Sequence, residues 1–171
     1  GDNAPLEIVK GALQGKERFD VDIVLTGDTT AILKALEACG VKELPQGVEI
    51  AHADEVVEMC DDPATVFRRK KNSSMALGLN MVKEGKGDAF VSAGSTGATL
   101  AGGMFRLGRI PGVERPALAP VINNGKGRFL LIDCGANVDC KPEYLVQFGV
   151  MGDAYMKGVW GVKNPRIGLA N

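Results

Sequence analysis

The chain has 171 residues, of which 45% are hydrophobic and 24% charged; this is the composition of a folded globular protein and excludes a disordered segment. Its 20 basic and 21 acidic residues leave a net charge of −1, which argues against nucleic-acid binding because phosphate neutralisation needs a basic surplus. Glycine is the outlier, since 23 residues are roughly double the usual share of ~7%.

Helical and strand patterns alternate along the sequence. The first predicted elements are, in chain order, a helix over 5–16, a strand over 21–26, a helix over 29–39, a strand over 48–53 and a helix that starts at 61–63 and ends in the basic run at 68–71. They are followed by a helix over 73–84, a strand over 88–92, a helix over 95–107, strands over 117–122 and 128–133, a helix over 142–160 and a strand over 165–171. Pro5 suits a first helical turn, with Asp2 or Asn3 as its cap.

This alternation predicts an α/β fold, a sandwich with a mostly parallel sheet. No linker, repeat or low-complexity stretch interrupts the pattern, so we expect residues 1–171 to form a single α/β domain. No strand pattern precedes the first helix, and the last strand pattern runs to the final residue. We therefore expect the domain to be truncated at both ends.

The four cysteines, Cys39, Cys60, Cys134 and Cys140, show no CxxC spacing, and His52 is the only histidine, so no metal site is predicted. Unpaired, core-like cysteines are typical of a reducing cytosol. No apolar run approaches the ~18 residues of a spanning helix, and we expect a cytoplasmic protein. We interpret His52 as a strand-edge residue rather than a catalyst, and Cys134 as a packing residue rather than a nucleophile.

A run of small and hydroxyl-bearing residues follows the predicted strand over 88–92. It consists of Ser92, Ala93, Gly94, Ser95, Thr96, Gly97 and Ala98. The two glycines let the backbone approach a ligand, the hydroxyls add donors, and the amides of residues 94–97 would point outward at a helix start. This favours a phosphate cradle, although the run is neither a Walker A loop nor a clear GxGxxG motif. The alternative is a small-residue turn that packs a helix close to the sheet.

A second polar loop, Asp133–Lys141, lies between a predicted strand and the helix that begins with Pro142. Asn137 and Lys141 are suited to orient and neutralise an oxyanion, with Asp133 holding them in place. We expect this loop at the same sheet edge as the 92–98 run, because ligands collect beyond the carboxyl ends of parallel strands. The alternative is that Asp133 and Asn137 only cap a turn.

Four adjacent cations, Arg68, Arg69, Lys70 and Lys71, form the third candidate. Such a run is most often a solvated helix end. Four neighbouring side chains cannot all face one way, so at most two can reach a shared anion. The others are free to meet an acidic partner protein.

Five segments of the chain resemble the bacterial phosphate acyltransferase family PlsX. They are Asp2–Pro5, Arg68–Met75, Asp88–Ala98, Arg115–Leu118 and Asp133–Pro142. The resemblance runs through the whole chain in the right order and covers about the first half of the family's usual length. Ser95 stands where many members carry Asn, and Cys134 and Cys140 stand where Val and Ala are commoner.

The resemblance implies acyl transfer from acyl carrier protein to inorganic phosphate, giving an acyl phosphate for phospholipid synthesis without metal or cofactor. It also implies a homodimeric three-layer αβα fold related to phosphotransacetylases and to isocitrate- and isopropylmalate-type dehydrogenases. The enzyme would associate peripherally with the membrane and hand its product to the glycerol-3-phosphate acyltransferase there. The alternatives are a phosphotransacetylase-like acyltransferase that uses coenzyme A and a non-catalytic phosphate-binding module.

Phosphate is already a nucleophile at neutral pH, so this reaction needs positioning and oxyanion stabilisation rather than an activated serine or cysteine. The resemblance therefore assigns phosphate or substrate binding to the 92–97 cradle with Asp2 and Asn3. Asn137 or Lys141 would stabilise the oxyanion. The Arg68–Lys71 run would dock the acidic carrier protein.

Overall fold

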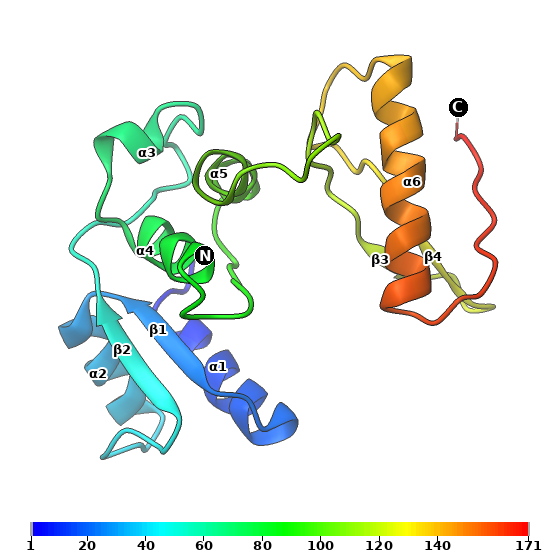
Figure 1. The fold of residues 1–171 in the computed structure, drawn as a ribbon. Coiled ribbons are helices and arrows are strands. Elements are labelled where there is room, and N and C mark those ends of the chain that lie inside the picture. The colour runs from blue at the N-terminus through cyan, green and yellow to red at the C-terminus, as the bar shows by residue number, and fades with distance from the viewer. Residues whose placement is uncertain (1, 171) are drawn as a thin grey trace. The chain divides into compact units, whose positions relative to one another are not determined.

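The structure is a computed structural model that describes residues 2–170, and the chain divides into two compact units, Gly1–Gly108 and Arg109–Asn171. The elements of the first unit are α1 (Leu6–Phe19), β1 (Ile23–Gly27), α2 (Thr29–Ala38), β2 (Val48–His52), α3 (Val66–Arg69), α4 (Ser74–Lys83), α5 (Thr96–Gly102) and the π-helix η1 (Gly103–Leu107) (Figure 1). Those of the second are β3 (Val121–Asn123), β4 (Arg128–Leu130) and α6 (Pro142–Gly158).

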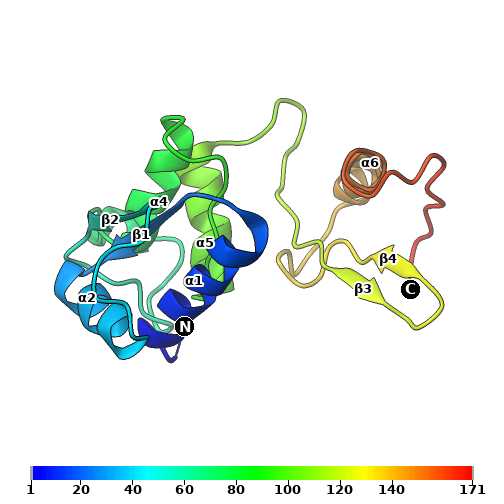
Figure 2. The same cartoon turned by 90° about the horizontal axis from the view of Figure 1, so that it is seen from below.

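After α1, the first unit contains a β–α–β arrangement. β1 and β2 pair in parallel, and the pairing runs from Ile23 opposite Val48 to Gly27 opposite His52. Between them, the Asp28 carboxylate caps α2 by accepting a hydrogen bond from the Ala31 N–H at 2.7 Å. The sheet lies between α4 and the pair α1 and α2 (Figure 2). The predicted α/β class, with parallel strands joined by a helix, is thereby confirmed.

Two apolar clusters stabilise this unit. The first joins α1, α2 and the sheet through Val9, Leu25, Ile32, Ala35, Leu36 and Val48. The second joins α3, α4 and α5 through Val66, Phe67, Met75, Ala76, Leu79, Ala98 and Ala101. The second cluster is the one that supports the segments around the 92–98 run and the basic run.

Gly102 lies against this second cluster with no room for a side chain. A Cβ there would lie 2.5 Å from Leu79 Cδ1 and 2.7 Å from Phe67 Cζ, whereas a Cβ on the neighbouring Gly103 would meet nothing within 4 Å. Both glycines have right-handed helical backbones.

Gly102→Ala is therefore expected to lower the free energy of unfolding by about 1–2 kcal/mol, because overpacking outweighs the gain in helix propensity. Gly103→Ala, the matched control, is expected to leave it unchanged or raise it by up to ~1 kcal/mol. Urea unfolding of the two variants measures the difference. Equal free energies of unfolding would contradict the packing around Gly102.

The second unit is a short antiparallel hairpin followed by α6. β3 and β4 are joined by a turn in which the Asn124 N–H donates to the Gly127 carbonyl at 3.0 Å. β3 and β4 are thus shorter than the strands predicted over 117–122 and 128–133, and β3 begins directly after Pro120, which has no N–H to donate to a ladder. Two further backbone hydrogen bonds, Leu131 to Pro120 and Cys134 to Leu118, keep the two segments side by side.

Two predicted strands are wrong. Residues 88–92 and 165–170 are not strands, and within the described residues neither segment makes a backbone hydrogen bond to a neighbouring segment. A strand needs such a partner, and an apolar run alone does not supply one. Residue 171 of the second prediction lies outside the described residues.

Two predictions about helices also need correction. The single helix expected over 95–107 changes at Gly103 into a π-helix, in which the Gly108 N–H donates to the Gly103 carbonyl at 3.1 Å. Neither Asp2 nor Asn3 caps α1, whose N-cap is Pro5 with no side-chain hydrogen bond. Asn3 contributes only its carbonyl, which accepts from the Glu7 N–H.

None of the helices in residues 2–170 has the length and apolar character needed to cross a membrane.

Candidate functional site

The 92–98 run forms a tight turn into α5. The Ser92 hydroxyl accepts a hydrogen bond from the Gly94 N–H at 3.1 Å. The Ser95 hydroxyl, which is buried, caps α5 by accepting from the Ala98 N–H at 3.3 Å. The hydroxyl group at position 95 therefore caps the helix, and its role toward a ligand stays a prediction.

Three successive backbone N–H groups of this turn remain free. Among residues 2–170, no acceptor is hydrogen-bonded to the N–H of Ser95, Thr96 or Gly97. Thr96 and Gly97 are exposed. Unpaired N–H groups at the start of a helix are available to an anion, and the phosphate cradle expected for this loop stays a prediction.

Gly97 is explained by contact with the protein itself. A Cβ at this position would lie 2.9 Å from Pro63 Cγ, so the side of Gly97 that a side chain would occupy faces Pro63. This contact with Pro63 is enough to explain why the residue is a glycine, without a ligand beside it. Substituting it would disturb packing as well as binding.

The Asp133 carboxylate organises the second loop. One oxygen accepts from the Leu118 N–H at 2.7 Å and the Ala136 N–H at 3.3 Å, and the other accepts from the Asn137 N–H at 2.7 Å. Burial opposes ionisation of this carboxyl, but its hydrogen bonds from the Asn137 side chain and from three backbone N–H groups outweigh burial and lower its pKa. Asp133 is thus a fixed anion at neutral pH that ties the loop to the hairpin.

The Asn137 side-chain amide has both of its N–H groups engaged. Nδ2 donates to Asp133 Oδ2 at 2.9 Å and to the Pro116 carbonyl at 2.9 Å. An amide NH₂ has two donors, so none is left for an oxyanion. In this conformation Asn137 positions the loop, which is the alternative given above for this residue.

Lys141 is the cation of this loop that remains available. It is the N-cap residue of α6, is exposed, and has its Nζ 6.0 Å from the centre of the Tyr144 ring. In the part of the chain that the structure describes, no carboxylate lies within 4.0 Å of it. Of the residues predicted to stabilise an oxyanion, Lys141 is the one with free donors.

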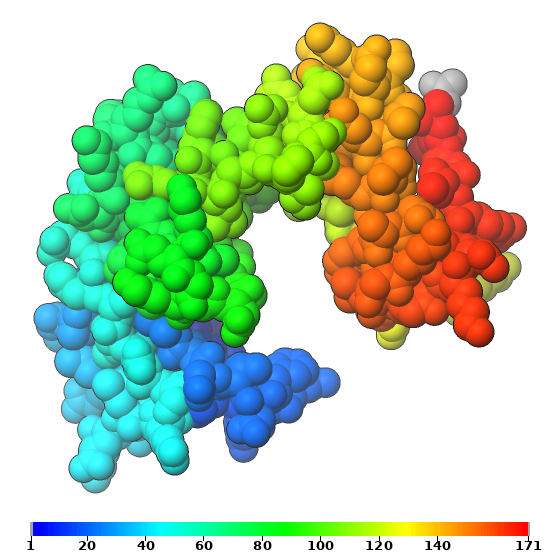
Figure 3. All heavy atoms as spheres, viewed as in Figure 1, coloured from blue at the N-terminus to red at the C-terminus, as the bar shows by residue number. Residues whose placement is uncertain are grey.

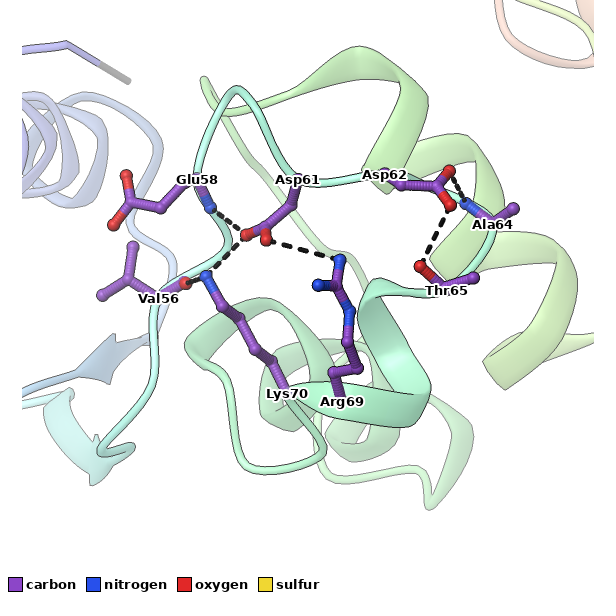
Figure 4. A network of polar contacts seen from close by, with 8 residues as sticks. All are labelled: Val56, Glu58, Asp61, Asp62, Ala64, Thr65, Arg69 and Lys70. Atoms are coloured by element: carbon purple, nitrogen blue, oxygen red, sulfur yellow. Dashed lines mark hydrogen bonds and ion pairs between the residues drawn. The ribbon is translucent and has the colours of Figure 1, made fainter.

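Half of the basic run is engaged by one carboxylate. Lys70 Nζ donates to Asp61 Oδ2 at 2.6 Å and to the Val56 carbonyl at 2.7 Å, and Arg69 lies 3.8 Å from Asp61 (Figure 4). Asp61 also accepts from the Glu58 N–H. The hydrogen bond from Lys70 and then that from Glu58 lower the pKa of Asp61. The sequence analysis did not predict that Asp61 pairs with the basic run. The signal for this pairing was an acidic residue at 61 that lies close in sequence to Arg69 and Lys70.

Arg68 and Lys71 are exposed, and within residues 2–170 neither has a carboxylate within 4.0 Å. Figure 3 shows the segment containing α3 at the surface of the first unit. Of the four cations predicted to form a docking surface, Arg69 and Lys70 are thus paired with Asp61, and Arg68 and Lys71 stay available to a partner.

The remaining candidates have separate environments. Asp2 and Asn3 are exposed, and no side-chain hydrogen bond is formed by either of them with residues 2–170. His52, at the end of β2, contacts Asp54 Oδ1 at 2.8 Å and Thr29 Oγ1 at 3.0 Å, as expected for a strand-edge residue.

The expectation of core-like cysteines is wrong for three of the four. Cys60, Cys134 and Cys140 are exposed, and Cys39 is half-buried. In the described residues, no group of three His, Cys, Asp or Glu side chains is arranged to hold a metal ion.

Comparison with known proteins identifies close relatives. The sequence matches the family model described as "Fatty acid synthesis protein" over residues 1–171. A phosphate acyltransferase of Desulfitobacterium hafniense (strain Y51) is 48% identical over 171 residues, which cover 100% of this chain and 50% of the relative. Those of Pelotomaculum thermopropionicum and Bacillus licheniformis are each 50% identical, over 99% and 100% of this chain and 48% and 51% of their own lengths. The chain spans about half the length of the curated relatives it matches.

Proposed function

The chain belongs to the fatty acid synthesis protein family, and from this premise we propose that the full-length protein transfers a fatty acyl group from acyl carrier protein to inorganic phosphate. The observation that carries the proposal is the match of the whole chain to relatives named phosphate acyltransferase at 48–50% identity. In the reaction, a phosphate oxygen forms a bond to the thioester carbonyl carbon. The carbon–sulfur bond then breaks, and the carrier thiolate leaves with the electron pair.

We assign phosphate binding to the cradle formed by the free N–H groups of Ser95, Thr96 and Gly97. Backbone donors suit this task because they are held by the fold and need no reorganisation when the dianion binds. Ser92 and Gly94 support the turn through their mutual hydrogen bond. Asp2 and Asn3 remain proposed substrate-binding residues on the basis of the family resemblance alone.

We assign oxyanion stabilisation to Lys141. The carbonyl oxygen of the thioester gains negative charge only as phosphate attacks, so a cation that meets it there lowers the barrier more than it tightens binding. Asp133 and Asn137 are positioning residues in this assignment, since their hydrogen bonds fix the loop that precedes Lys141.

The family resemblance also supports a proposed architecture for the complete protein. This is a homodimeric three-layer αβα sandwich of the phosphotransacetylase or isopropylmalate dehydrogenase type. The protein would be cytoplasmic and peripherally membrane-associated, and would deliver acyl phosphate to the membrane glycerol-3-phosphate acyltransferase. Sedimentation of the full-length protein, with and without lipid vesicles, tests the dimer and the membrane association.

Arg68 and Lys71 are the proposed docking cations for the acidic carrier protein, because Lys70 and Arg69 are engaged by Asp61. Reversing both charges (Arg68→Glu with Lys71→Glu) is expected to lower the association rate about tenfold at low ionic strength and to flatten its salt dependence.

A reversal of Lys10 and Lys86, two exposed lysines elsewhere on the first unit, is the matched control and should leave both quantities unchanged. Stopped-flow mixing with labelled carrier protein measures the rates. Salt slopes equal to the parent's in the Arg68 and Lys71 variant would count against this docking surface.

The activity is tested by incubating the full-length protein with inorganic phosphate and either acyl carrier protein thioester or acyl coenzyme A. Trapping with hydroxylamine detects acyl phosphate. We expect product with the carrier protein thioester. Product from acyl coenzyme A alone would instead indicate a phosphotransacetylase-like enzyme, and phosphate binding without product would indicate a non-catalytic module.

A further inference from the structure

The Asp61 carboxylate is held against the basic run and is largely shielded from water, since its side chain is 12% exposed (Figure 4). One oxygen lies 2.6 Å from Lys70 Nζ, and the other lies 3.8 Å from Arg69 Nη2. The Glu58 N–H also donates to this carboxylate, at 2.7 Å. Asp61 therefore places a fixed negative charge beside two of the four cations.

The two cations are held with different strength. The Lys70 side chain is 28% exposed, and its Nζ donates to the Val56 carbonyl at 2.7 Å as well as to Asp61, so two acceptors fix it. The Arg69 side chain is 61% exposed, and its distance of 3.8 Å from Asp61 is that of an ion pair without a hydrogen bond. Exposed ion pairs of this kind are weak. Another carboxylate therefore replaces Asp61 at Arg69 more easily than at Lys70.

An acidic protein competes with Asp61 for the Arg69 guanidinium. A guanidinium presents parallel N–H donors that match a carboxylate, but the negative charge of Asp61 weakens the attraction of Arg69 for any further anion. Arg68 and Lys71, on either side of the pair, have no carboxylate within 4.0 Å in the described chain. The basic run thus offers two open cations and one that is masked.

We propose that Asp61 is an autoinhibitory contact that masks Arg69 from acidic proteins, and that a carboxylate of the partner displaces Asp61 when it binds Arg69. Lys70 stays bonded to the loop through the Val56 carbonyl during this exchange. The exchange makes and breaks ion pairs only. The proposal rests on the proposed function for the identity of the partner, the acidic carrier protein, whereas the masking rests on the contact between Asp61 and Arg69 alone.

The test measures binding of the full-length protein to two labelled probes, a hexaglutamate peptide and acyl carrier protein. Asp61→Asn is expected to lower the Kd for both probes about threefold, mainly through slower dissociation, because it frees Arg69 to pair with the probe. Asparagine retains a side-chain oxygen that can accept from the Glu58 N–H, so the loop should keep its conformation.

Asp62→Asn is the matched control. It removes the same charge one residue away, from a carboxylate that accepts from the Ala64 N–H and the Thr65 hydroxyl rather than from a cation. Both variants gain the same long-range attraction for an acidic probe, so their association rates should rise equally. Only Asp61→Asn should slow dissociation. Equal dissociation rates in the two variants would overturn the proposal.

Two further variants test the masking in the parent protein without a change at Asp61. Arg69→Gln is expected to change the Kd for hexaglutamate by less than about 1.5-fold, whereas Arg68→Gln should raise it about threefold. In the Asp61→Asn protein, Arg69→Gln should cancel the gain in affinity. Equal losses from Arg69→Gln and Arg68→Gln in the parent would contradict the masking. A gain from Asp61→Asn with hexaglutamate but not with carrier protein would support the masking and reject carrier protein as the partner.

Discussion

Changing Thr96 to Pro is expected to raise the KM for inorganic phosphate by roughly 10- to 100-fold, because it removes one of three backbone donors to a charged ligand. Thr96 is the first residue of α5, a position where proline fits a helix and its missing N–H breaks no helical hydrogen bond. The extended ψ of 116° at Ser95 also suits a residue that precedes proline. The fold should therefore survive the change, which steady-state kinetics in phosphate then measures.

Thr96→Val separates the backbone from the side chain. Valine removes the hydroxyl and keeps the N–H at nearly the same volume, so we expect its phosphate KM to stay within about threefold of the parent's. If Thr96→Pro and Thr96→Val raised the KM equally, the hydroxyl and not the backbone would hold phosphate. A folded Thr96→Pro variant with an unchanged KM would remove the cradle from the site.

Lys141→Met is expected to lower kcat about 100-fold while the KM for phosphate changes little, because the removed charge acts on the transition state. Methionine retains most of the apolar stem beside Tyr144, so α6 should keep its packing. Lys126→Met, in the exposed hairpin turn, is the control and should retain full kcat.

Single-turnover kinetics with saturating phosphate measures this effect on the chemical step. A loss confined to KM would make Lys141 a binding residue. Full activity in a folded Lys141→Met variant would leave the oxyanion without a donor from this loop, since the Asn137 amide is already bonded to Asp133 and Pro116.

Local signals predicted much of the first unit. The helix Thr29–Ala38 and the strands around it follow from apolar periodicity, and the structure adds a local cap, Asp28, that lies next to the residues it serves. The same holds for the turn around Asp133, whose partners include residues three and four positions ahead. Sequence patterns report such short-range relations well.

Long-range relations were not predictable in this way. An apolar run at 88–92 reads as a strand, but strand formation depends on a neighbouring backbone that no local pattern specifies. Likewise Phe67, Leu79 and Ala101 share one core only because α3, α4 and α5 pack against one another. Free N–H groups were predicted for residues 94–97 from the expected helix start, and those of 95–97 are free, whereas the Gly94 N–H donates to Ser92. The engagement of the Asn137 amide became visible only in its contacts.

The oxygen atoms of phosphate provide the most direct test of acyl transfer. When the full-length protein is given acyl carrier protein thioester and phosphate labelled with ¹⁸O at all four positions, we expect acyl phosphate that retains all four labels by mass spectrometry. Retention follows because a phosphate oxygen attacks the carbonyl carbon and no phosphorus–oxygen bond breaks. Release of free fatty acid as the only product, or acyl phosphate that has lost a label, would contradict the proposed reaction.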